Sequence, residues 1–228
     1  CGSGKSRRPG GPAVDFFSTA TTVAGEAPGS RVIGGSTPPP PGNPGMDSLT
    51  GRILVASQRL RDPNFARSVV LLVHHDARGA LGVVLNRAGN RRVEATIAAP
   101  GDEERRVDLP VMIGGPMTGP LMVVHGDPDH AEREIIPGLF FAAAEDRLES
   151  LLAGVRPPVR IYSGYAGWAK GQLEAEIASG AWGVSDASPE LVFGDETTLW
   201  QRVSRAVADA ALARDLRIRH VPPEPWHN

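Results

Sequence analysis

The chain of 228 residues is long enough for one sizeable domain or two small ones, and its 41% hydrophobic and 22% charged residues are typical of a soluble globular protein. The net charge of −2 excludes a global basic field that attracts nucleic acid, and no apolar run approaches the roughly 18 residues of a membrane span. The single cysteine, Cys1, excludes an internal disulfide framework and a cysteine-rich metal site, and we expect a reducing, cytoplasmic compartment.

Residues 1–45 differ in composition from the rest of the chain. Gly, Pro, Ser and Thr dominate them without a sustained apolar period, so the segment cannot bury enough surface to offset the entropy of ordering it. We expect a disordered leader over residues 1–45, locally extended at residues 38–41, and one domain over residues 46–228. We expect Met46 to be the natural start of that domain, with the residues before it contributed by an over-extended reading frame or a dispensable leader.

Two other interpretations of the leader are weaker. The run "GSGKS" at residues 2–6 is similar to the end of a P-loop, but prolines follow at once and the flanking strand and helix are missing. Cys1 as the lipid-bearing residue of a processed lipoprotein would need a signal peptide.

Strands dominate the first part of the predicted domain. The run "SVVLLVHH" at residues 68–75 is continuous and β-branched, which is typical of a strand buried on both faces. A turn over residues 76–79 joins it to the next strand as a hairpin. A polar, charge-mixed stretch follows Arg87, and residues 99–106 are expected to be exposed. The predicted strands are residues 51–57, 68–75, 80–87, 107–116, 119–127 and 158–165.

Helices are predicted in the later part, over residues 143–154, 171–180 and 196–214. The first places Leu148, Leu151 and Leu152 on one face. Hairpins followed by helices favour an α+β (α/β) fold: a single compact domain with a mixed β-sheet flanked by a few helices. No G-x-G-x-x-G lies between a strand and a helix, so a doubly wound nucleotide fold is not supported.

A series of motifs, in this order, resembles the YqgE/AlgH family of bacterial proteins. The motifs are "LTGRILVAS" (49–57), "DPNFARSVVLLVHHDARGALGVVLNR" (62–87), "IGGPM" (113–117), "LMVVH" (121–125), "AEDRLESLLAG" (144–154) and "GYAGWAKGQLEAEIASGAW" (164–182). Ala169 and Lys170 stand where the family tends to have Gly-Pro, and Met117 where it tends to have Val. The resemblance implies a compact fold with a bulged, coiled sheet. One branch of the family bears the label of a transcriptional regulator, and no catalytic residue set or cofactor comes with the family.

Polar and glycine residues gather where predicted strands end and a predicted helix begins. Strand ends are where sites in α/β sheets tend to gather. The glycines before the 171–180 helix, together with the helix N-terminus, favour an anion, and Lys170 adds a positive charge. Tyr165 and Trp168 could stack on a planar ligand. The predicted ligand-binding residues are Asn86, Arg87, Gly114, Gly115, Tyr165, Trp168, Lys170, Gln172 and Glu176.

A structural interpretation of the same residues outweighs the ligand site. The glycines then serve positive φ angles or close packing, and Tyr165 and Trp168 are core aromatics. Arg87 is then one half of an ion pair with Glu174 or Glu176.

Other kinds of site find less support. His74 and His75 point to opposite faces of a strand, so they cannot share an ion without a bulge. His125, Asp127 and His130 lie in a polar turn where solvated histidines are expected rather than zinc.

Nucleophilic and acid–base catalysis find no support, because the domain lacks a cysteine and a G-x-S-x-G elbow, and Glu174 and Glu176 diverge on a helix. With residues 1–45 set aside, 24 acidic residues exceed 20 basic ones, so direct nucleic-acid binding is disfavoured.

We therefore expect a non-enzymatic regulatory or accessory protein that acts through a partner protein or a small anionic ligand, without membrane contact. The alternative is a hydrolase or transferase in which Arg87, Lys170 and Gln172 position an anionic metabolite. An enzyme needs convergent polar groups in a concave pocket, whereas an interaction module needs an exposed apolar patch with a polar rim.

Overall fold

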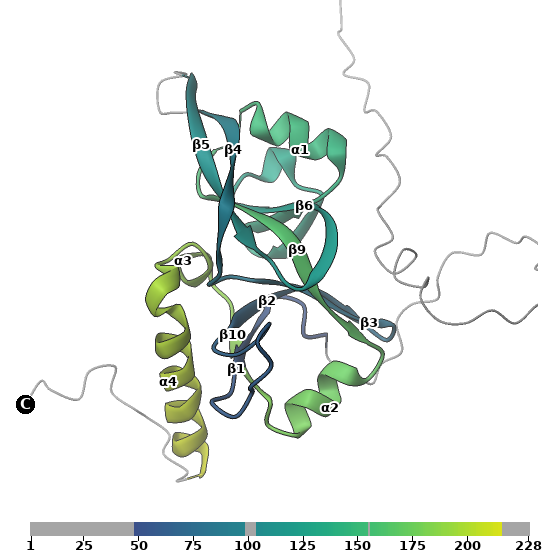
Figure 1. The fold of residues 1–228 in the computed structure, drawn as a ribbon, viewed down its shortest axis with the longest axis vertical. Coiled ribbons are helices and arrows are strands. Elements are labelled where there is room, and N and C mark those ends of the chain that lie inside the picture. The colour runs from purple at the N-terminus through teal and green to yellow at the C-terminus, as the bar shows by residue number, and fades with distance from the viewer. Residues whose placement is uncertain (1–47, 99–103, 155, 216–228) are drawn as a thin grey trace, which may run out of the picture. The chain divides into compact units, whose positions relative to one another are not determined.

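A computed structural model describes residues 48–98, 104–154 and 156–215 (Figure 1). All of them belong to the compact unit Asp47–Asn228, so the predicted leader lies outside the described residues. The strands are β1 Arg52–Ala56, β2 Val69–Asp76, β3 Gly79–Val84, β4 Ala88–Ala98, β5 Glu104–Ile113, β6 Met117–His125, β7 Arg133–Ile136, β8 Leu139–Ala142, β9 Val159–Ala169 and β10 Trp182–Asp186. The helices are α1 Glu145–Leu152, α2 Gln172–Ala178, α3 Pro189–Val192, α4 Glu196–Asp215 and the 3₁₀ turn η1 Pro128–His130.

The predicted α+β (α/β) class with a mixed sheet is wrong. The strands form one sheet that is mostly antiparallel and curls into a half-barrel with few helices. Eight of the nine described strand pairings are antiparallel, and only β5 with β9 is parallel. The prediction failed because β4, β7, β8 and β10 lie in segments where we predicted no strand.

Several local predictions are confirmed. β2 and β3 form the expected hairpin, with a bulge between Leu72 and His74, and β2 is buried along nearly its whole length. The three predicted helices correspond to α1, α2 and α4. No helix in the described part of the chain is long and apolar enough to cross a membrane.

β9 connects the parts of the sheet. It pairs with β3 through its last residues, with β6 through most of its length, and with β5 through Ile161–Ser163. The strands approach closely at Gly114, where an added Cβ would lie 2.1 Å from the carbonyl oxygen of Gly164. Glycine is therefore required there, because any side chain would overlap the neighbouring backbone.

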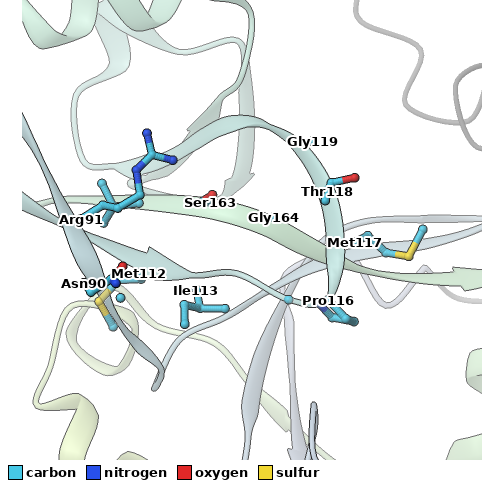
Figure 2. A pocket seen from close by; sticks show the side chains of 13 residues that line it. Asn90, Arg91, Met112, Ile113, Pro116, Met117, Thr118, Gly119, Ser163 and Gly164 are labelled. Atoms are coloured by element: carbon cyan, nitrogen blue, oxygen red, sulfur yellow. The ribbon is translucent and has the colours of Figure 1, made fainter.

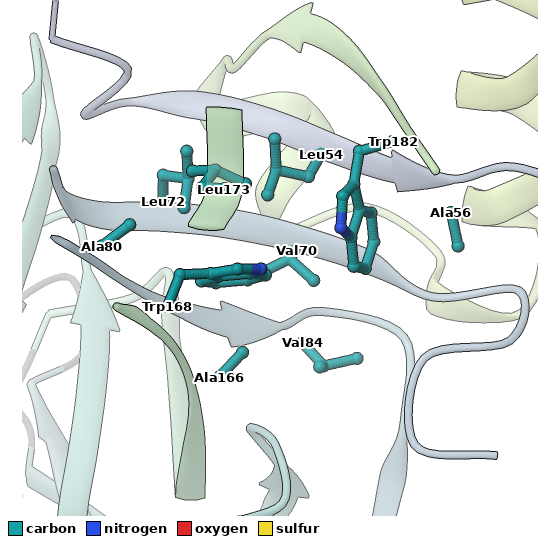
Figure 3. Packing of buried hydrophobic residues seen from close by; sticks show 10 residues of the cluster. All are labelled: Leu54, Ala56, Val70, Leu72, Ala80, Val84, Ala166, Trp168, Leu173 and Trp182. Carbon is teal, nitrogen blue, oxygen red and sulfur yellow. The ribbon is translucent and has the colours of Figure 1, made fainter. Parts of the chain in front are cut away.

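The core consists of two clusters of buried apolar side chains. The first packs Trp168 and Trp182 against β1, β2 and β3, and Leu173 of α2 covers it (Figure 3). The second contains Leu151 of α1 with Val111, Val123, Ala142 and Ile161 of the sheet. α4 packs against β1 and β10.

Candidate functional site

Helix α2 is attached to the sheet by the carboxylate of Glu176. Its Oε2 accepts hydrogen bonds from the indole Nε1 of Trp168 at 2.9 Å and of Trp182 at 2.8 Å. Its Oε1 accepts from Gln172 Nε2 at 2.9 Å, and Gln172 Oε1 accepts from the backbone N–H of Ala169 at 3.1 Å. Gln172 and Glu176 therefore hold the strand-to-helix turn in place.

Trp168 is a core aromatic, only 4% exposed. Phe65 stacks on it with ring centroids 6.1 Å apart, and Trp182 meets it edge-on at 6.0 Å. Tyr165 is half-buried and Lys170 is exposed. The ligand role of these residues stays a prediction.

Asn86 and Arg87 support the loop of residues 57–67. Asn86 Oδ1 accepts from the backbone N–H of Val69, and its Nδ2 donates to the carbonyl of Arg67, each at 2.9 Å. Arg87 Nη2 donates to the carbonyls of Pro63 at 3.1 Å and Ala66 at 3.3 Å. The expected ion pair of Arg87 with Glu174 or Glu176 is thus replaced by bonds to backbone carbonyls.

Glu174 pairs instead with His75. His75 Nδ1 accepts from the N–H of Leu49 at 3.0 Å, so Nε2 carries the proton that it donates to Glu174 Oε1 at 2.8 Å. Burial opposes ionisation of Glu174, but the hydrogen bonds from its own backbone N–H and from His75 outweigh burial and hold its pKa below the ordinary value. This pair is a second link between α2 and the sheet.

The expected solvated turn around His125 is wrong for two of its three residues. His125 and Asp127 are buried, because the last four residues of β6, residues 122–125, all lie inside the domain and Asp127 comes soon after them. Burial lowers the pKa of His125 to about 4. Asp127 accepts from the N–H of Asp129 at 3.1 Å and lies 3.2 Å from His130, so it stabilises η1. No three His, Cys, Asp or Glu side chains in the described part are arranged to hold a metal.

A hollow of about 350 Å³ lies where β4, β5, β6 and β9 meet (Figure 2). The register of β4 shifts between Ala88 and Arg91, and that of β6 shifts between Met117 and Leu121. These bulges move both strands away from regular pairing and open the space between them. Of the nine predicted ligand-binding residues, Gly115 lines this hollow.

The hollow combines apolar side chains with a polar rim. Ile113 is 46% exposed and Met117 is 45% exposed, and Leu212 is the one further exposed large hydrophobic residue among those described. The polar lining comes from Asn90, Arg91, Thr118 and Ser163. We did not predict these residues as a site, because Ile113 and Met117 resemble ordinary strand residues. The sequence feature that could have indicated them is their position on either side of "GGP" (residues 114–116).

Comparison with known proteins identifies relatives that all belong to one family. The family model described as AlgH-like matches residues 53–210. A UPF0301 protein of Chlorobaculum tepidum is 40% identical over 163 residues, which cover 68% of this chain and 85% of that protein. A UPF0301 protein of Myxococcus xanthus is 36% identical over 167 residues, which cover 71% of this chain and 92% of that protein.

Two solved structures are similar to the fold. The solution structure of the AlgH protein from Pseudomonas aeruginosa matches with a TM-score of 0.55 at 28% identity, over 84% of this chain and 100% of that one. The crystal structure of protein DIP2367 from Corynebacterium diphtheriae matches with a TM-score of 0.55 at 24% identity, over 71% of this chain and 88% of that one. The second likeness concerns the fold alone.

Proposed function

This chain belongs to the AlgH-like family, as its motifs predicted, and on that premise we propose that it is a non-enzymatic regulatory or accessory protein that binds a partner protein. The binding site is the hollow around Ile113 and Met117. The occupant is an extended partner segment with an apolar side chain and an acidic residue next to it. A regulatory effect on transcription would then act through protein contact.

The exposed apolar side chains are the observation that carries this proposal. Single hydrophobic residues on a surface are ordinary, but neighbouring ones within a hollow, surrounded by polar groups, are typical of interaction sites. Both large apolar side chains exposed on the described strands, Ile113 and Met117, lie in this one hollow. Burying such a side chain completely contributes roughly 1.5–3 kcal/mol, and since about half of each is still exposed, covering one contributes on the order of 1 kcal/mol.

Arg91 supports an acidic residue in the partner. It lines the hollow, and it has no carboxylate partner among the residues that the structure describes. A guanidinium binds a carboxylate in a bidentate manner, which specifies position as well as charge.

The strand irregularities support an extended segment. Gly89 and Asn90 lie within the register shift of β4, and Thr118, Gly119 and Pro120 lie within that of β6. The backbone N–H and C=O groups there lie outside the regular pairing of the sheet. An extended peptide segment can bind to backbone groups of this kind, while every second side chain of the segment enters a pocket.

The enzyme alternative gains no support from its proposed residues. Arg87 and Gln172 use their side chains on the backbone of this chain and on Glu176, and Lys170 is exposed. Neither Arg87, Lys170 nor Gln172 lines the hollow described above.

Selection from a displayed library of random linear peptides on the immobilised full chain tests the proposal. We expect enrichment of peptides that place an acidic residue near a large apolar one, with binding lost in Ile113→Asp and Met117→Asp. Leu212→Asp is the matched control, because Leu212 is also exposed but lies on α4, and it should bind normally. Equal binding by all three variants, or no enrichment, would overturn the proposal.

A further inference from the structure

We propose that a second hollow, between residues 57–67 and helix α4, binds the phosphoryl group of a small phosphorylated molecule. Its volume is about 600 Å³, within the range of small-molecule sites. The residues that carry the argument are Arg61, Arg67 and Trp200. None of the nine ligand-binding residues predicted from the sequence lines it.

Two arginines line this hollow without a carboxylate partner in the described part of the chain. Arg61 and Arg67 are both exposed and form no ion pair there. The adjacent carboxylate, Asp62, instead accepts from the backbone N–H of Asn64 at 2.7 Å. A guanidinium group matches phosphate oxygens in geometry as well as in charge.

Arg67 is held in an unfavourable backbone conformation. Its φ angle is +56°, the one positive φ among the described residues other than glycine. Such a conformation costs free energy and persists only where the surrounding structure enforces it, as at binding sites. Here Asn86 enforces it, because its amide bonds to the carbonyl of Arg67 and to the N–H of Val69.

The strained backbone places the Arg67 side chain over Trp200. Its Cζ lies 5.8 Å from the centre of the Trp200 ring, and Trp200 is itself fixed because its Nε1 donates to the carbonyl of Ala56 at 2.9 Å. The guanidinium is therefore presented to the hollow from a fixed position, which lowers the entropic cost of binding an anion.

Ser57 lies in the lining of the hollow. Its Oγ is buried and has no hydrogen-bond partner among the described residues. Buried polar atoms nearly always have a partner, so this one is an exception. Within the hollow this hydroxyl is enclosed by protein atoms, so the two arginines carry the binding of the phosphoryl group.

Titration calorimetry on the full chain tests the site, with inorganic pyrophosphate and adenosine monophosphate as probes. We expect both to bind, and Arg61→Ala and Arg67→Ala each to weaken binding by about tenfold or more, the effect of losing one charged hydrogen-bond partner. Arg59→Ala is the matched control: Arg59 is an exposed arginine of the same loop that does not line the hollow, and its loss should leave the affinity unchanged.

Absence of binding, or binding that all three variants retain equally, would overturn the proposal. Tighter binding of oligothymidylate than of adenosine monophosphate would overturn its assignment to a small molecule. Arg61 makes no described hydrogen bond, so Arg61→Ala keeps the test valid even if Arg67→Ala unfolds. Ile113→Asp should retain pyrophosphate binding, which separates this site from the proposed peptide site.

Discussion

Trp168 of β9 and Trp182 of β10 donate their indole N–H groups to the same oxygen atom, Oε2 of Glu176. Two tryptophans from strands that are not neighbours in the sheet are thus joined by one carboxylate from a helix. The turn before α2, with its glycines, aromatics and helix N-terminus, is held by these contacts.

Removing this carboxylate should destabilise the domain. In Glu176→Ala, both indole N–H groups lose their acceptor, and each partly buried donor left unpaired costs roughly 1–3 kcal/mol. Since Glu176 is itself half-buried, we expect the free energy of unfolding, measured with urea, to fall by about 2 kcal/mol. Glu149→Ala, at an exposed position of α1, is the control, and an equal loss in both variants would contradict the assigned role.

Trp168→Ala should cost more, because it removes a large buried ring as well as a hydrogen bond. Truncation of a buried tryptophan costs about 3–5 kcal/mol, so the melting temperature should fall by many degrees. Phe65 and Trp182 would lose their ring contacts at the same time. An unchanged melting temperature would show that Trp168 does not stabilise the core.

Gly114→Ala should prevent correct packing of β5 against β9. The new Cβ would lie 2.1 Å from the carbonyl oxygen of Gly164, and backbone cannot move aside as a flexible side chain can. We expect a loss of more than about 3 kcal/mol, or insoluble protein. Gly154→Ala is the matched control, because its Cβ would meet nothing within 4 Å, and it should fold normally.

His125 should make the domain sensitive to mild acid. Its pKa is about 4 in the folded state and about 6.5 in an unfolded chain. The unfolded state therefore binds the proton first as the pH falls, so stability decreases between about pH 6.5 and pH 4 and the effect levels off below that. The full effect is on the order of 3 kcal/mol.

The difference between the wild type and His125→Asn isolates this effect from the titration of carboxylates. Asparagine can accept from the N–H of Asp127 as the imidazole does but carries no titratable group. Urea unfolding at several pH values should show a smaller acid-induced loss in His125→Asn. Parallel curves for the two proteins would rule out His125 as the source.

The sequence pattern predicted correctly those helices and strands that can be recognised from their own residues alone. The β2–β3 hairpin followed from a β-branched run with a turn, and α1, α2 and α4 followed from helical periodicity. We did not predict β4 as a strand, because its charged residues resemble those of an exposed loop. It becomes a strand only by pairing with β5, a contact that its own residues do not reveal. The same limit produced the wrong fold class, since strand direction depends on pairing across the sheet.

The candidate sites show the same limit for side chains. Asn86 and Arg87 were recognised as chemically notable, but whether their polar groups face a ligand or the backbone of a neighbouring loop depends on tertiary contacts. Ile113 and Met117 were overlooked, because apolar residues in strands are usually buried. Both are exposed next to the register shifts of β4 and β6, which the sequence does not reveal.

The position of β9 between the two halves of the sheet has a consequence for synthesis. β3 completes its pairing only with Ala166–Ala169, and β1 acquires its second neighbour only with Trp182–Asp186. During translation, β1 and β3 pair with β2 early, but each leaves the ribosome long before its second partner, β10 or β9, has been made. The sheet can be completed only after β10 has left the ribosome. Such long-range pairing slows folding, and the edges of β1 and β3 stay unpaired in the meantime. Until β9 and β10 have been made, β3 and β1 each keep an unpaired edge that can associate with other chains.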